Sequence, residues 1–103
     1  LDRSAALVQP VAAIEPRKHD AQQRQQISAR LKALRKELEQ ADQHMSRLSA
    51  EKAVLEQRLS GRLAPADLAA DGKRLKSIND ELAALEERWL ALSGDIESVE
   101  TTA

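Results

Sequence analysis

The stretch ISARLKALRKELEQADQHMSRLSAEKAVLEQRL, residues 27–59, repeats its apolar side chains at alternating steps of three and four. This spacing is a heptad pattern, in which positions a and d form the apolar seam of a coiled-coil helix. The pattern continues for more than four heptads and is interrupted once, where Lys52 occupies a seam position. It therefore predicts one helix whose seam is about 50 Å long.

A second stretch, LKSINDELAALEERWLALSGDIESV at residues 75–99, repeats the same pattern without interruption. Between the two stretches, Ser60-Gly61 is typical of a helix stop and Pro65 of a helix start. Gly72 leads us to expect irregular geometry in the first part of the second helix. Two helices of similar length joined by a short turn pair antiparallel. We therefore predict an all-α fold, an antiparallel two-helix coiled-coil hairpin.

The N-terminal segment differs in character from the rest of the chain. Residues 1–16 are rich in Ala and Val, and Pro10 and Pro16 bracket a piece too short for a stable helix. We expect this segment to be a linker, disordered or extended, that joins the hairpin to something upstream. The expected boundaries are a hairpin over 17–100, with a first helix at about 17–60, a turn at about 61–66 and a second helix at about 67–100.

The predicted seam residues all occupy heptad positions a or d. They are Leu31, Leu34, Leu38, Ala41, Met45, Leu48, Ile78, Leu82, Leu85, Trp89, Leu92 and Ile96. In the antiparallel register the only aromatic residue, Trp89, faces Leu38, so we expect a core position rather than an exposed stacking surface. Lys52 facing Leu75, and Leu55 facing Asp71, make two weak layers. They predict looser packing in the third of the hairpin nearest the turn.

Charges beside the seam test the register independently of the apolar pattern. Antiparallel g positions give the pairs Arg58–Asp67, Glu51–Arg74, His44–Glu81, Glu37–Arg88 and Arg30–Asp95. Exposed pairs of this kind add only about 0.2–1 kcal/mol each, and their main role is to select register and orientation. On the other flank Asp42 faces Glu86, a like-charge mismatch. Val54 and Leu90 lie off the seam and are candidates for contact with another body.

Composition limits the possible classes of protein. Aromatic residues make up 1% of the 103 residues, charged residues make up 32%, and the formal net charge is −1. This balance does not indicate nucleic-acid binding through overall charge. The chain has no Cys, no apolar run of membrane-spanning length and no signal-peptide pattern, which leads us to expect a cytoplasmic protein without a membrane partner.

No residue pattern predicts catalysis or metal binding in this chain. Neither His19 nor His44 has a second ligand at metal spacing. The acidic pairs 80–81 and 86–87 lie on an exposed helix face and do not indicate a buried acid and base. We therefore expect no enzyme activity and no cofactor in this part of the protein.

Basic residues are concentrated where the predicted pairing leaves them unmatched, whereas Arg30 and Arg35 are expected to be neutralised by acids across the hairpin. Residues 17–36 carry seven basic residues against Asp20, a net charge of +6, whereas residues 80–100 carry seven acids against Arg88, a net of −6. The predicted nucleic-acid-binding residues are Arg17, Lys18, Arg24, Lys32 and Lys36 near the first helix start, and Arg62, Lys73 and Lys76 near the turn. No aromatic residue lies among them, so base stacking is not expected.

The stretches RKHDAQQRQQISARLKALRKELEQ (17–40) and LEERWLALSGDIE (85–97) resemble the C-terminal coiled-coil domain of bacterial ABC-F ATPases, closest to the Uup/YheS-like branch. The shared features are an LRKE helix start at 34–37 and a Trp-containing helix end at 89–97. The resemblance covers about residues 17–100. Ala33 departs from the pattern, because relatives often carry Pro before LRKE.

The resemblance implies an accessory arm of a larger protein. ABC-F proteins are ATPases with two nucleotide-binding domains that use ATP and Mg²⁺, and many act on the ribosome during translation. Their C-terminal hairpin is a nucleic-acid-binding arm in the Uup-like branch. The expected partners are therefore DNA, ribosomal RNA or the ribosome, together with the parent ATPase domains.

Two alternative interpretations remain open from the sequence. The C-terminal hairpin of valyl-tRNA synthetases is built in a similar way and contacts tRNA, but its usual FVxKAP-like turn is absent from LAPADLAADG at residues 63–72. The other alternative is a purely structural coiled coil that dimerises. The expected oligomeric state is a monomer or a weak homodimer.

Overall fold

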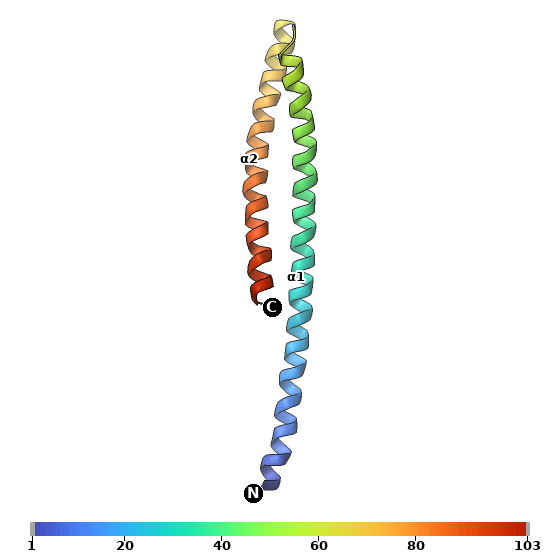
Figure 1. Ribbon diagram of the computed structural model, residues 1–103, viewed down its shortest axis with the longest axis vertical. Helices are drawn as coiled ribbons and strands as arrows, with labels where there is room; N and C mark the ends of the chain where they lie inside the picture. The colour runs from blue at the N-terminus through green and yellow to red at the C-terminus, as the bar shows by residue number, and fades with distance from the viewer. Residues whose placement is uncertain (1, 103) are drawn as a thin grey trace.

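The chain forms one long helical hairpin (Figure 1). The computed structural model describes the backbone of residues 2–102 and the side chains of residues 18–102. Helix α1 spans Asp2–Leu59 and helix α2 spans Pro65–Thr102. The helices pack side by side and run in opposite directions, in a rod measuring 94 × 15 × 14 Å. The predicted all-α antiparallel hairpin is confirmed.

Helix α1 begins earlier than expected. Its first residue is Asp2, so residues 2–16, including Pro10 and Pro16, have helical backbone instead of the disordered or extended conformation expected of a linker. A proline inside a helix removes one backbone hydrogen bond, but its fixed φ is compatible with helical geometry. In Figure 1 this part of α1 continues beyond the level at which α2 ends. Its role as a linker stays a prediction.

The turn between the helices occupies residues 60–64. At the end of α1, the Ser60 N–H donates to the Glu56 carbonyl at 3.1 Å and the Ser60 hydroxyl donates to the Gln57 carbonyl at 2.7 Å. At the start of α2, the Leu68 N–H donates to the Ala64 carbonyl at 2.9 Å. Pro65 occupies the first helical position, where an N–H has no helical partner and its absence costs nothing.

Helix α2 is helical from its first residue and passes through Gly72 without interruption. The irregular geometry expected before residue 73 is therefore absent from this helix. A Cβ at Gly72 would meet no atom within 4 Å, so no close packing requires glycine there. The other predicted boundaries differ from the observed ones by two residues or fewer, apart from the start of α1.

The interface between the helices follows the heptad seam. Leu34, Ala41, Leu48, Ile78 and Leu92 are buried. The other predicted seam residues, Leu31, Leu38, Met45, Leu82, Leu85, Trp89 and Ile96, are half-buried. These side chains are only half-buried because a single partner helix covers them from one side.

Packing near the turn differs from the sequence-based expectation in two respects. Leu55 is buried and forms a core cluster with Leu48 and Ile78, so this third of the hairpin is not short of apolar contacts. Leu68 falls on the heptad pattern when that pattern is continued back from Leu75 toward the turn, opposite Leu59, but it is 49% exposed. Asp71, at a seam position, is buried. The apolar seam between the two helices therefore ends one heptad before the turn.

Candidate nucleic-acid interface

Two of the predicted flank pairs are present as ion pairs. Arg74 donates to Glu51 through Nε at 2.9 Å and through Nη2 at 2.7 Å, a two-point contact between α2 and α1. Arg88 donates to Glu37 through Nη2 at 2.5 Å. Within residues 18–102 the structure has no ion pair between His44 and Glu81 or between Arg30 and Asp95. The observed pairs place the two helices in the predicted register.

A third predicted pair has a different partner. Arg58 Nε lies 2.8 Å from Oδ2 of Asp71, not beside Asp67. Helical side chains incline toward the N-terminus of their own helix, so Arg58 reaches back along α1. In an antiparallel pair this direction leads to residues that follow Asp67 along α2. The inclination therefore selects Asp71, one helical turn further on.

The contact with Arg74 changes the acidity of Glu51. The hydrogen bonds from Arg74, with a smaller contribution from its positive charge, lower the pKa of the Glu51 carboxyl below its ordinary value, although partial desolvation opposes this. The same hydrogen bonds raise the pKa of the Arg74 guanidinium. Both groups are therefore held in their charged forms.

The predicted basic residues remain open to solvent. Lys18, Arg24, Lys32, Lys36, Arg62, Lys73 and Lys76 are all exposed. Among the described side chains none of these seven has a carboxylate within 4.0 Å. The side chain of Arg17 lies outside the described residues. Charge neutralisation across the hairpin thus does not extend to these basic groups.

Three cations come together on α1. Lys32, Arg35 and Lys36 line one shallow groove on the helix surface, together with Ser28, Leu31 and Glu39. Spacings of three and four residues place them on one side of the helix. Sequence reasoning omitted Arg35 from this group, because a partner in the acidic half of the chain was expected. Arg35 does pair with Glu100 at 3.3 Å, yet its side chain is 59% exposed.

The basic residues near the turn form a separate group. Lys73 and Lys76 lie one turn apart on α2, and Arg62 lies in the turn itself. Lys36 precedes the end of α1 by more than twenty residues, or about 35 Å of helix. The fold therefore presents two basic regions along the rod and does not join them into one site.

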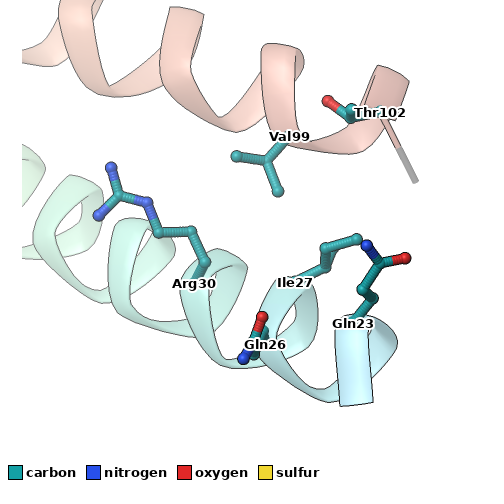
Figure 2. A pocket seen from close by; sticks show the side chains of 6 residues that line it. All are labelled: Gln23, Gln26, Ile27, Arg30, Val99 and Thr102. Carbon is teal, nitrogen blue, oxygen red and sulfur yellow. The ribbon is translucent and has the colours of Figure 1, made fainter. Parts of the chain in front are cut away.

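At the open end of the hairpin the helices leave a notch (Figure 2). Ile27 on α1 and Val99 on α2 provide its apolar surface, and Val99 points toward α1. Its polar rim consists of Gln23, Gln26, Arg30 and Thr102. This notch marks the last apolar layer of the seam, and the exposed Arg24 lies beside it in sequence.

Trp89 does not offer an open aromatic surface. The residue is half-buried, and its Nε1 atom is shielded from solvent without a hydrogen-bond partner. Trp89 lines a small apolar groove together with Met45, Glu86 and Leu90. Because no other Trp, and no Phe or Tyr, occurs in the sequence, nucleic-acid contact has to use charge and polar groups.

The fold and the basic regions define the class of the molecule as an antiparallel coiled-coil hairpin with exposed cations. The sequence model of the ABC transporter C-terminal domain family matches residues 32–94, more than half of the chain, and the chain belongs to this family. It is thus an accessory domain of an ABC protein. Searches of curated proteins and of solved structures returned no significant match. No helix among the described residues is both long and apolar enough to cross a membrane.

The matched range covers most of the hairpin. It starts at Lys32, inside the basic groove, and includes Lys36, the turn and Trp89. Lys18 and Arg24 precede it. The family assignment leaves the valyl-tRNA synthetase alternative without support, because the match is to an ABC protein domain.

Proposed function

We propose that this chain is a non-catalytic accessory arm of an ABC-F ATPase and that it binds nucleic acid, DNA or ribosomal RNA, through its exposed basic residues. ATP and Mg²⁺ belong, in this proposal, to nucleotide-binding domains of the parent protein. The cytoplasm and the ribosome are the corresponding location and partner.

The observation that supports the proposal is the groove on α1 that gathers Lys32, Arg35 and Lys36. Lys32 and Lys36 have no carboxylate within 4.0 Å among the described side chains, so their charges are available to an anion. The helix already fixes the backbone that carries these cations, so no backbone has to become ordered when an anion binds. A polyanion that releases counterions on contact is the natural ligand of such a row.

The experiment is a titration of the chain with duplex DNA, with ribosomal RNA and with tRNA at two salt concentrations. The double variant K32Q/K36Q should weaken binding and make it less dependent on salt, by about one unit of slope for each phosphate that the variant no longer neutralises. R47Q is the matched control, because Arg47 is also exposed and has no ion-pair partner among the described residues but lies outside the groove.

A loss of affinity in K32Q/K36Q no more than about twice the loss in R47Q, which removes one charge instead of two, would show diffuse charge attraction and no groove. Absence of binding at low salt would refute the proposal itself. A preference for one of the three nucleic acids that survives at the higher salt concentration identifies the partner. Separate substitution of Arg62, Lys73 and Lys76 by Gln then tests whether the turn contributes a second contact.

A further inference from the structure

Both grooves beside the seam open on the same flank of the hairpin. The residues Met45, Glu86, Trp89 and Leu90 line one groove, and Lys32, Arg35 and Lys36 line the other. All of them occupy heptad positions a, b, e or f. The ion pairs Glu51–Arg74 and Glu37–Arg88 occupy g positions and therefore lie on the opposite flank. We call the flank with the two grooves the Trp89 face.

Apolar groups on the Trp89 face are incompletely covered. Leu90 is 65% exposed, more than Val54 or Leu68, and lines the same groove as the half-buried Trp89. The Trp89 indole N–H has neither a protein acceptor nor access to solvent. A leucine and a tryptophan that line one groove form a surface that gains free energy when another body covers it.

The same face carries uncompensated acidic charge. Asp42 and Glu86 face one another in the heptad register, and both are exposed. Within residues 18–102 neither has a cation within 4.0 Å. Like charges at facing positions weaken a helix pair, so the mismatch leaves this face with negative charge that the hairpin itself does not offset.

We propose that the Trp89 face binds the Trp89 face of a second copy of this chain, with the two rods parallel. A two-fold axis along the rods then places α1 of each copy on α2 of the other. This axis keeps every residue at the same height along the rod. Since Leu38 faces Trp89 within one hairpin, Lys36 of one copy lies at the height of Leu90 of the other. The aliphatic part of Lys36 covers Leu90 of the other copy. Its ammonium inclines toward the N-terminus of α1 and therefore toward Glu97, which follows Leu90 along α2.

Charge decides between the two possible orientations. In the parallel arrangement Lys32 and Lys36 both approach Glu97 of the other copy, and each contact occurs twice. In the antiparallel arrangement α2 would lie on α2, in the region where residues 80–100 carry seven acids and one arginine. Repulsion between those acids excludes the antiparallel dimer.

Self-association competes with nucleic-acid binding. Both interactions use Lys32 and Lys36, so one copy of the chain cannot engage a second copy and a polyanion with the same side chains. The dimer is therefore the form of the arm that holds no nucleic acid.

The test is sedimentation equilibrium of the full chain over a wide concentration range, without nucleic acid, together with Trp89 emission. We expect a monomer–dimer equilibrium and a shift of the emission to shorter wavelength as concentration rises. L90Q should weaken dimerisation at least about tenfold. V54Q is the matched control, since Val54 is 58% exposed but lies away from the Trp89 face, and it should leave dimerisation unchanged.

Charge exchange tests the orientation. K36E and E97K should each weaken the dimer, and K36E/E97K should restore it, while helix content by circular dichroism stays constant in all variants. A chain that is monomeric with constant emission at every concentration would overturn the proposal. So would a dimer weakened equally by V54Q and L90Q, or a double variant no stronger than the single ones.

Discussion

Arg58 Nε lies 2.8 Å from Asp71 Oδ2, which places an ion pair at a seam position that the heptad reserves for an apolar side chain. Asp71 is 9% exposed, and its Oδ2 is buried without a hydrogen-bond donor, since the close approach of Arg58 lacks hydrogen-bond geometry. The guanidinium, whose side chain is 51% exposed, thus offsets the buried charge by proximity.

Removing that guanidinium should destabilise the hairpin. We expect R58A to lower the free energy of unfolding by about 1–2 kcal/mol, because a buried carboxylate then has no counter-charge. Urea unfolding followed by circular dichroism measures the change. D71L should be neutral or stabilising, since an apolar residue suits the position. A loss of stability in R58A no larger than that in R47A, where the arginine has no ion-pair partner among the described residues, would contradict this role.

The Glu51–Arg74 contact should appear in the pH dependence of stability. The pKa of Glu51 is lowered in the folded state, so its contribution is present above the ordinary value of 4.5 and is lost as pH falls through the lower folded value. Carboxyl NMR titration of Glu51 should show the low pKa, and R74Q should return it toward the ordinary value. The same titration in R47Q, which should match the unsubstituted chain, is the control. A Glu51 pKa that R74Q leaves unchanged would assign the shift to another cause.

Ile78 should dominate the stability of the seam. It is 0% exposed and belongs to the cluster with Leu48 and Leu55, so I78A should cost about 2–5 kcal/mol in unfolding free energy. L68A is the matched comparison, because Leu68 is 49% exposed and should lose less than about 1 kcal/mol. Similar losses of stability in both variants would mean that the seam extends to the turn.

The fluorescence emission of Trp89 should reflect its packing between the two helices and not stacking on a base. Its half-burial predicts emission at a shorter wavelength than that of a water-exposed indole. Saturation of a dilute, monomeric sample with nucleic acid should leave the emission unquenched, and W89F should bind nucleic acid with the same affinity, because the contacts are to phosphates. Strong quenching, or loss of affinity in W89F, would place a base against the ring.

Much of the fold follows from local sequence features. The heptad run from Ile27 to Leu59, its counterpart ending at Val99 and the break between Ser60 and Pro65 predict the hairpin and its orientation. The pairs Glu51–Arg74 and Glu37–Arg88 follow from the same register. The helical backbone through Pro10 and Pro16 was not predicted, because local preference there favours extended geometry.

The candidate site was only partly predictable. Lys32 and Lys36 follow from the uneven distribution of charge. Arg35 was excluded on the assumption that an ion pair would occupy it fully, but a long side chain can hold Glu100 and still line a groove.

The sequence by itself determined the two helices, their antiparallel pairing and their register, because a three-and-four apolar repeat can be buried by one partner helix in few ways. The tertiary structure alone decided which side chains that pairing leaves open. Arg58 reaches Asp71 and not Asp67 because helical side chains incline toward the N-terminus. Leu90 stays exposed because it lies off the seam, where the single partner helix does not reach, and Leu68 stays exposed because the seam ends one heptad before the turn.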